Sequence, residues 1–439
     1  MRSRPTSTFV FARTPITDLF ARAAFASVVA GAVLAQGILS AAETDVKNWP
    51  QFLGPTRNGQ STDKNLVDSF PKAGPKIVWR VPGGEGMSGI ALEGGIAITL
   101  VQRDGKQTAL ALDAATGKER WSQPITAGYD NSMGTGPRGT PTIAAGSVYA
   151  FSGEGVLAAL EQSTGKIRWQ HDVVRELHGE VADYGMACSP LVVDGIVMVT
   201  AGAPGGTVVA YQADSGKLAW KLGNDTAGYS SPALLHVGGQ TQIVVFTGNA
   251  AIGLEPSEGK QLWRYPYKTN FDCNIATPIA VGDDVFISAG ENHGSALLKL
   301  NKAGSTFDVQ EVWTSFGPKS VLRNEWQTSL LHNGYLYGFD NIGGAGPITN
   351  LTCVNAKTGE RVWQQAKFGK GNAILADGKL YIITIKGELV IVRAIPEKFD
   401  ELARAKVLDT TRQAPALVDG HLYLRDSDDI VCVDIRAAK

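Results

Sequence analysis

Short runs of alternating apolar and polar residues, separated by turn-forming residues, make up most of the chain. In the clearest run, the apolar segment 109–112 enters the turn from Asp113 to Lys118, and a second strand leaves it toward Trp121. Gly117 in this turn can adopt the positive φ that a short hairpin loop requires. The pattern therefore predicts β-hairpins along the chain.

The hairpin is repeated, with a glycine four residues before a tryptophan in each copy. The spacing occurs at Gly117 and Trp121, Gly165 and Trp169, Gly216 and Trp220, Gly259 and Trp263, and Gly359 and Trp363. Trp79 and Trp313 extend the series, and consecutive tryptophans lie 42, 48, 51, 43, 50 and 50 residues apart. Periods of this length are typical of propeller blades.

A second pair of strands precedes each hairpin and begins at a small residue followed by proline, as at 140–141, 189–190 and 277–278. Four strands per repeat define a propeller blade. Residues 76–81 carry a tryptophan strand with no blade before it, and residues 414–435 carry strands with no tryptophan after them. We therefore predict an all-β propeller of four-stranded antiparallel blades, in which the N-terminal strand completes the last blade.

The expected number of blades is eight, with seven as the alternative. Seven tryptophan strands and a degenerate strand near Val407 give the total of eight. The segment 371–407 is the weakest repeat, because it lacks a tryptophan and because residues 396–404 have a helical pattern. A blade is a small sheet covered only by its neighbours, so the repeated tryptophans are expected to fill the wedges between blades.

The first 42 residues have the pattern of a secretory signal peptide. Four arginines accompany the apolar, small-residue run 23–35, and Ser40-Ala41-Ala42 fits the small-x-small rule of signal peptidase. Cleavage near Ala42 would leave a periplasmic or secreted chain without a transmembrane span, since a spanning helix needs about 20 apolar residues. An uncleaved anchor is the alternative. We expect residues 43–76 to form an extended arm and residues 77–439 to form the propeller.

The charge balance argues against nucleic acid as a partner. Without residues 1–42 the chain has 37 basic and 41 acidic residues, a net charge of −4. Such a chain is not expected to bind nucleic acid. The four cysteines, Cys188, Cys273, Cys353 and Cys432, are widely spaced and are expected to be buried thiols, with disulfides as the alternative in an exported protein.

The run from Ala111-Leu112-Asp113 through Gly117 to Trp121 resembles the tryptophan-docking motif of PQQ-like β-propeller repeats. That family includes quinoprotein dehydrogenases and non-catalytic relatives such as the outer-membrane assembly factor BamB. The segment 49–59 also resembles the start of many exported bacterial members. The resemblance covers about residues 77–439 and implies the fold. It implies no activity, because the same motif serves enzymes and scaffolds.

The enzymatic branch of this family would imply a flat pocket for PQQ, a Ca²⁺ ion held by oxygen ligands, and an aspartate as general base. Its alcohol-oxidising members also have a pair of adjacent cysteines, which this sequence lacks. We therefore assign no cofactor from the sequence. PQQ and calcium are expected only if the protein is an enzyme.

Residues outside the repeat pattern are the candidates for function. In Arg323-Asn324-Glu325-Trp326, the tryptophan precedes an inner strand and is expected near the central channel. All four side chains are candidates for binding a cofactor, and Asn324 and Glu325 would offer oxygen ligands to a metal. The alternative is a loop that plugs the channel mouth.

Other blades also place polar residues where the chain enters the channel. Asp183 and Asp272 are the candidates for a catalytic base. The wider polar set comprises Arg138, Tyr184, Tyr229, Ser230, Ser231, Asn274, Lys370, Asn372, Arg412 and Gln413. The run His178-Gly179-Glu180 followed by Asp183 suggests a metal site, with a solvated loop as the alternative.

Together these features favour an exported, monomeric binding or scaffold protein of the cell envelope, with a protein or a polymer as its partner. A PQQ-dependent dehydrogenase that oxidises an alcohol or sugar is the alternative. A third interpretation is an adhesion or polysaccharide-binding module.

Overall fold

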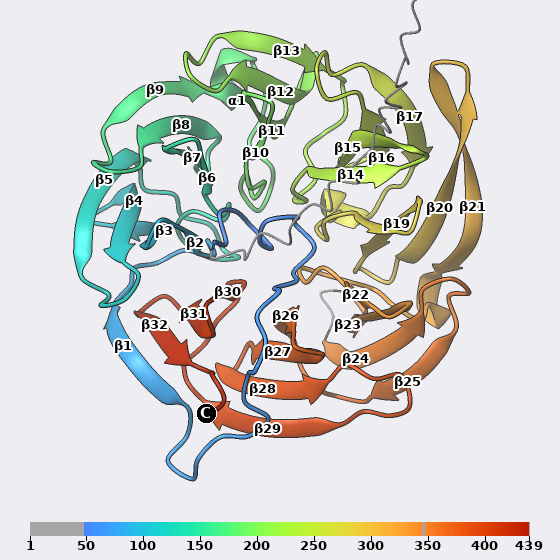
Figure 1. The fold of residues 1–439 in the computed structure, drawn as a ribbon. Coiled ribbons are helices and arrows are strands. Elements are labelled where there is room, and N and C mark those ends of the chain that lie inside the picture. The colour runs from blue at the N-terminus through green and yellow to red at the C-terminus, as the bar shows by residue number, and fades with distance from the viewer. Residues whose placement is uncertain (1–47, 345–346, 439) are drawn as a thin grey trace, which may run out of the picture. The chain divides into compact units, whose positions relative to one another are not determined.

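A computed structural model describes residues 48–344 and 347–438. Within these ranges the chain forms strands β1 to β32, the one-turn helix α1 (Val173–Glu176), and the 3-10 turns η1 (Asn270–Asp272) and η2 (Gly317–Lys319). The strands assemble into eight antiparallel sheets of four strands each. These sheets are the blades of a propeller arranged around one axis (Figure 1), so the eight-bladed prediction is confirmed.

The first four blades follow one another along the chain. Blade 1 contains β2 (Ala91–Glu93), β3 (Ile96–Arg103), β4 (Lys106–Asp113) and β5 (Glu119–Ala127). Blade 2 contains β6 (Thr142–Ala144), β7 (Ser147–Phe151), β8 (Val156–Glu161) and β9 (Ile167–Asp172). Blade 3 contains β10 (Leu191–Val193), β11 (Ile196–Ala203), β12 (Gly206–Gln212) and β13 (Leu218–Leu222). Blade 4 contains β14 (Ala233–Val237), β15 (Gln240–Phe246), β16 (Ala250–Leu254) and β17 (Gln261–Pro266).

The remaining blades continue this order, and the last one recruits β1. Blade 5 contains β18 (Ile279–Val281), β19 (Asp284–Ala289), β20 (Gly294–Ala303) and β21 (Thr306–Phe316). Blade 6 contains β22 (Leu330–His332), β23 (Tyr335–Ile342), β24 (Ile348–Asn355) and β25 (Arg361–Gln365). Blade 7 contains β26 (Gly371–Ala376), β27 (Lys379–Thr384), β28 (Glu388–Arg393) and β29 (Glu401–Lys406). Blade 8 contains β30 (Ala416–Val418), β31 (His421–Arg425), β32 (Asp429–Asp434) and β1 (Lys76–Pro82).

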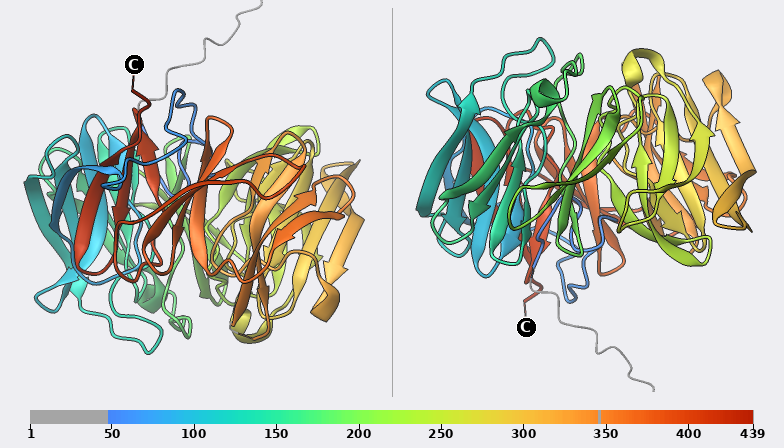
Figure 2. Two further views of the ribbon diagram at one scale, coloured as in Figure 1. Left: turned by 90° about the horizontal axis from the view of Figure 1, so that it is seen from below. Right: turned by 90° about the horizontal axis from the view of Figure 1, so that it is seen from above.

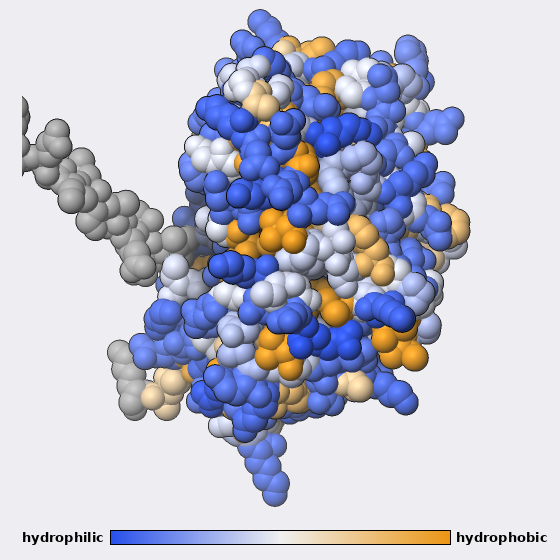
Figure 3. Space-filling model, turned by 90° about the vertical axis from the view of Figure 1, so that its right-hand side faces the viewer, coloured by the Kyte–Doolittle hydropathy of each residue, from blue (hydrophilic) through white to orange (hydrophobic). Residues whose placement is uncertain are grey.

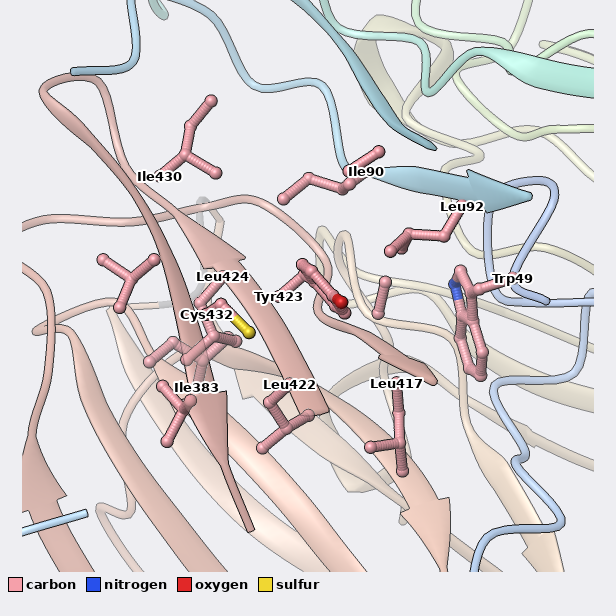
Figure 4. Close-up of a cluster of buried hydrophobic side chains, with 14 of the residues drawn as sticks. Trp49, Ile90, Leu92, Ile383, Leu417, Leu422, Tyr423, Leu424, Ile430 and Cys432 are labelled. Atoms are coloured by element: carbon pink, nitrogen blue, oxygen red, sulfur yellow. The ribbon is translucent and has the colours of Figure 1, made fainter. Parts of the chain in front are cut away.

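The ring is closed by β1, as predicted. This strand pairs antiparallel with β32 and places Trp79 opposite Cys432. At the first position of this pairing, Lys76 Nζ lies 3.0 Å from the carboxylate of Asp434. Side chains of blades 7, 8 and 1 pack together with Trp49 in a buried hydrophobic cluster, part of which is drawn in Figure 4. Closure therefore joins the two ends of the propeller through both a sheet and a core.

Repeated tryptophans join consecutive blades. The Trp79 ring lies against Gly117 of blade 1, where an added Cβ would come within 2.8 Å of the ring. Its indole N–H donates to the Ala114 carbonyl at 3.0 Å. The same ring-to-glycine contact recurs for Trp121 on Gly165, Trp169 on Gly216, Trp220 on Gly259, and Trp313 on Gly359. Glycine is required at these turns because a side chain would collide with the indole.

Trp263 departs from this pattern. Its indole N–H donates to Gln242 Oε1 of its own blade at 2.7 Å, and its ring covers the backbone of Gly253. The hairpin of β20 and β21 that follows is longer than its counterparts and lacks the Thr-Gly-Lys turn. Phe307 of that hairpin instead packs against Gly238 in blade 4. Trp263 thus remains a structural residue, with a different partner.

Residues 396–404 are not helical, so that expectation was wrong. The chain there leads into β29, which pairs with β28 and supplies the outer strand of blade 7. Local helix propensity is a weak preference that pairing in a sheet overrides. This strand has no docking tryptophan, and its Arg404 pairs with Glu388 and Glu401 of the same blade.

Residues 48–75 run across one face of the propeller as an arm. Trp49 bridges to Leu92, Gln60 to Leu375, and Leu66 to Arg436. Figure 2 shows the arm on one face of the ring, and α1 with several long loops on the other. Within the part of the chain that the structure describes, the arm therefore covers one face, and the central channel is accessible from the face with α1.

The four cysteines are free and buried, as expected. The outer rim is mostly hydrophilic with separate hydrophobic spots on the side shown in Figure 3. None of the helices in the described part of the chain is long and apolar enough to cross a membrane.

Candidate functional site

An arginine of the arm closes one end of the central channel. The Arg57 side chain is 1% exposed. Its guanidinium donates to the carbonyls of Ser189, Pro190 and Pro232, which lie beside the inner strands of blades 3 and 4. Gln51 Oε1 accepts a further bond of 2.7 Å from Arg57 Nε. Burial without a carboxylate partner lowers the pKa of Arg57 to about 10, because desolvation disfavours the charged form.

The opposite end of the channel is an open cavity of about 500 Å³, called here the axial pocket. Phe52 of the arm contributes to its lining. The other lining residues come mainly from the loops that precede the inner strands: Met87, Gly89, Met133, Arg138, Thr140, Tyr184, Ala187, Ser189, Tyr229, Ser231, Phe271, Cys273, Ile275, Glu291, Glu325, Trp326, Gly344, Asn372, Arg412 and Ala414. Loops held by a rigid ring of blades are a common setting for binding sites.

Trp326 and Glu325 meet two cations in the axial pocket. Lys370 Nζ lies 2.6 Å from Glu325 Oε2 and 4.9 Å from the centre of the Trp326 ring. The Arg412 guanidinium lies 5.1 Å from the same ring. Burial raises the pKa of Glu325, and the hydrogen bond and charge of Lys370 oppose that rise. The cluster therefore combines a flat aromatic surface with positive charge.

Arg323 and Asn324 face the protein interior instead of the pocket. Arg323 forms a bidentate ion pair with Asp340, with Nε 2.7 Å from Oδ1 and Nη2 2.9 Å from Oδ2. Asn324 Nδ2 donates to the Phe339 carbonyl, and its Oδ1 accepts from Ser329. Both side chains are almost fully buried. Of the four consecutive candidates, the structure therefore brings only Glu325 and Trp326 to the cavity.

A second cavity, of about 560 Å³, adjoins the axial pocket and is called here the acidic pocket. It holds both candidate bases, Asp183 and Asp272, together with Glu180 and His178. Tyr229 and Phe271 line both cavities. The two aspartates are thus placed in the neighbouring compartment, across these rings from Trp326.

The other predicted polar residues mostly support the loops. Arg138 donates to the carbonyls of Tyr184, Gly134 and Gly136, and its guanidinium stacks 4.5 Å from the Tyr129 ring centre. Ser230, Ser231, Asn274 and Gln413 are buried and bonded to backbone or neighbouring side chains. Asn372 Nδ2 donates to the Arg412 carbonyl. Of the wider set, Arg138 and Arg412 therefore bring charge to the lining of the axial pocket, and Lys370 contacts Glu325 and Trp326 at its wall.

Sequence reasoning missed the apolar residues of the pocket. Phe52, Met87, Met133, Phe271 and Ile275 all line it. They lie in loops without periodicity, so no hydrophobic pattern marks them. Phe271, which is 61% exposed, is the member that a search for unexplained loop aromatics could have found.

The residues present do not fit a calcium ion of the type that the quinoprotein resemblance implies. Such an ion needs six to eight oxygen ligands. The side-chain amide of Asn324 is already hydrogen-bonded inside the core, and the charge of Glu325 is neutralised by Lys370. Within residues 48–344 and 347–438, no group of three or more histidine, cysteine or acidic side chains is arranged to hold a metal.

The family model described as outer membrane protein assembly factor BamB matches residues 63–172, 105–345 and 349–437. BamB of Yersinia pestis is 21% identical over 289 residues, which are 64% of this chain and 70% of that protein. A quinohemoprotein alcohol dehydrogenase of Pseudomonas putida is 23% identical over 54% of this chain, and the match spans only 33% of the dehydrogenase.

The fold is also similar to a crystal structure of quinohemoprotein alcohol dehydrogenase from Comamonas testosteroni. The TM-score is 0.66 and the identity 14%, over 91% of this chain and 82% of the other. This likeness concerns the fold alone. With the family model covering most of the propeller, the chain belongs to the PQQ-like β-propeller family whose model describes BamB.

Proposed function

We propose that this protein is a binding protein of the cell envelope that holds an organic ligand in the axial pocket. The observation that carries the proposal is the one-sided cavity of about 500 Å³ at the propeller axis. The arm and Arg57 close its far end, and loops of several blades surround its open end. The size and mixed lining of the cavity are those of a small-molecule or peptide site.

The envelope location rests on the sequence of residues 1–42, which lies outside the described residues, and on the kinship with BamB. The expected partner is accordingly an envelope component, either a protein segment or a polymer end. The same sequence features support a periplasmic or secreted chain, and we propose that it acts as a monomer.

A thermal-shift screen of the purified protein tests the proposal. The probes are short peptides, oligosaccharides, and PQQ with Ca²⁺, each added separately. We expect at least one probe class to raise the Tm of the wild type and to leave that of Trp326→Ala unchanged, because a ligand stabilises only the state that binds it. Phe316→Ala is the matched control, since Phe316 is an exposed aromatic on β21 at the rim. A shift that survives Trp326→Ala places the ligand elsewhere and contradicts the proposal.

A PQQ-dependent dehydrogenase is the alternative function. The observation that favours it is the pair of cations beside Trp326, which suits a flat, carboxylated ring system. Dye-linked oxidation of an alcohol or sugar in the presence of PQQ and Ca²⁺ tests it, together with the cofactor absorbance of the dialysed protein. Activity that is lost in both Glu325→Ala and Trp326→Ala would replace the binding proposal with the enzymatic one.

A further inference from the structure

We propose that the axial and acidic pockets together bind one short peptide, with an apolar C-terminal residue, a free carboxylate and a basic group one or two residues upstream. The inference rests on the proposed function, because it names the ligand of the same site. Four observations carry it: the shared wall, the strained turn at that wall, the opposite charges of the two pockets, and their size.

The two pockets form one elongated site. Tyr229 and Phe271 line both cavities. The Tyr184 ring lies 5.6 Å from the Tyr229 ring and 6.4 Å from the Phe271 ring, centre to centre. These three rings form a low aromatic divide. A ligand that fills the axial pocket and continues outward therefore crosses the divide into the acidic pocket.

The backbone of the turn that carries Phe271 is strained. Phe271 and Asp272 have φ of 56° and 52°, which places two consecutive non-glycine residues in the left-handed region. Phe271 is nevertheless 61% exposed, so burial of its ring does not offset the strain. Strained backbone of this kind is concentrated at ligand-binding sites, where the surrounding structure imposes it.

The anchor of the strained turn is a buried asparagine. Asn274 is 0% exposed, and its Nδ2 donates to the carbonyls of Thr247 at 2.7 Å and Tyr267 at 3.1 Å. Its backbone N–H donates to the Asp272 carbonyl at 2.7 Å. The core of blade 4 thus holds the turn in place and presents Phe271 to solvent at the pocket mouth.

The charges of the two pockets are opposite. Arg138, Arg412, Glu291 and Glu325 line the axial pocket, and Lys370 pairs with Glu325 beside Trp326, so the cations of this pocket outnumber its carboxylates by three to two. The acidic pocket holds three carboxylates, from Glu180, Asp183 and Asp272. Complementary charge orients a bound ligand. A carboxylate therefore belongs at the axial end and a basic group at the acidic end, an arrangement that a short peptide with a free C-terminus provides.

The apolar lining selects the terminal side chain. Phe52, Met87 and Ile275 line the axial pocket together with the Trp326 ring. The cavity of about 500 Å³ holds one large apolar side chain with its carboxylate. An extended peptide advances about 3.3 Å per residue, so a residue two positions upstream lies roughly 7 Å away, beyond the aromatic divide.

Isothermal titration calorimetry of the purified protein with the tripeptide Lys-Ala-Phe tests the inference. We expect measurable binding of the free acid and about tenfold weaker binding of the C-terminal amide, because the amide loses a charge-assisted hydrogen bond. Replacing the N-terminal lysine by acetyl-glutamate should weaken binding further, since the acidic pocket repels it. The contribution of charge should shrink as salt is raised.

Two variants localise the two ends of the peptide. Arg412→Gln should weaken binding of the free acid about tenfold and leave binding of the amide unchanged, as expected for directly interacting groups. The double variant Asp183→Asn, Asp272→Asn should bind Lys-Ala-Phe and Ala-Ala-Phe equally. Glu258→Gln is the control, because Glu258 is an exposed carboxylate in the hairpin between β16 and β17.

The outcomes separate this inference from the proposed function. Equal affinity for acid and amide, or indifference of the acid to Arg412→Gln, overturns the peptide inference. If only an oligosaccharide or PQQ binds, and does so through Trp326, the inference fails while the axial site stands. If no probe binds at all, both fail together.

Discussion

The two ends of the central channel are built around arginines in opposite circumstances. At the arm face, Arg57 is fully buried, and its donors are matched by carbonyls of blades 3 and 4 and by Gln51. At the other face, Arg412 is half-buried, donates to the Met133 carbonyl, and lies over the Trp326 ring. One guanidinium fastens the arm to the ring. The other is positioned where a ligand can reach it.

The comparison teaches that charge in a propeller channel has two uses, and that hydrogen-bond partners distinguish them. A buried charge with several fixed acceptors contributes to structure, and losing it leaves those acceptors without a donor. A charge beside an open cavity adds little to folding and remains available for binding. Substitutions at the two ends should therefore separate stability from function.

The largest expected effect is the loss of stability in Arg57→Ala. Removing the guanidinium leaves buried carbonyls unsatisfied and detaches the arm, so the free energy of unfolding should fall by about 3 kcal/mol or more. Urea denaturation measures this change. Arg120→Ala, which breaks an exposed ion pair with Asp113, should cost at most about 1 kcal/mol and is the control. Equal effects of the two substitutions would show that Arg57 is not the fastening residue.

A second contrast concerns two tryptophans. Trp169 packs on Gly216 and donates to the Ala213 carbonyl at 3.0 Å, so Trp169→Ala should lower the free energy of unfolding by about 2–4 kcal/mol. Trp326→Ala should change it by less than about 1 kcal/mol, because the residue lines an open cavity. Ligand binding, in contrast, should be weakened more by Trp326→Ala than by Trp169→Ala. If Trp326→Ala destabilises the fold as much as Trp169→Ala does, the distinction between structural tryptophans of the repeat and Trp326 is contradicted.

Phe271→Gly should keep or raise stability while weakening binding. Glycine removes the left-handed strain at φ 56°, and the entropy it adds to the unfolded chain partly cancels the gain, so we expect an increase of up to about 1 kcal/mol. Little burial is lost, since the ring is 61% exposed. Differential scanning calorimetry with and without Lys-Ala-Phe measures both effects. A clear loss of stability would mean that the ring is needed for folding and not for a ligand.

The smallest effect concerns the pH dependence of ring closure. Hydrogen bonds from Arg436 and Lys76 hold the pKa of Asp434 well below its usual range. A lowered folded-state pKa gives stability that is present above the unfolded value of about 3.9 and is lost as the pH falls below it. Because its partners Lys76 and Arg436 are largely exposed, the loss should be about 0.5–1 kcal/mol. In acid denaturation, Asp434→Asn should therefore differ most from the wild type at pH 7, and the difference should shrink progressively as the pH falls below about 4. If the stabilities of the wild type and the variant differed by the same amount at every pH, the predicted contribution of Asp434 to the pH dependence would be contradicted.

Much of the fold could be predicted because its determinants are repeated. Each Gly-to-Trp spacing marks one blade contact, and the unmatched strands at the two ends indicate closure. Blade 5 was predicted from its first strand pair and Trp313, but its longer hairpin lacks the glycine motif, so the sequence did not reveal that Trp263 takes a partner in its own blade. The helix predicted at residues 396–404 was wrong because the local helix propensity there opposes the sheet pairing that the rest of blade 7 imposes.

The candidate site was predictable only in part. Trp326 could be placed near the axis because it breaks the repeat just before an inner strand. Its neighbours Arg323 and Asn324 could not be assigned, since the direction of each side chain in an irregular segment depends on the local backbone. Arg57 and Phe271 lie in segments without periodicity. Their roles follow from long-range hydrogen bonds and from backbone strain, neither of which a sequence displays.

Hydrogen–deuterium exchange of the wild type, with and without saturating Lys-Ala-Phe, tests the central claim most directly. The account predicts slower exchange in the loops around Met133, Tyr184, Phe271, Trp326 and Arg412, and unchanged exchange in the outer strands of the blades. Protection confined to the rim or to the arm, or no protection anywhere, would contradict an axial binding site.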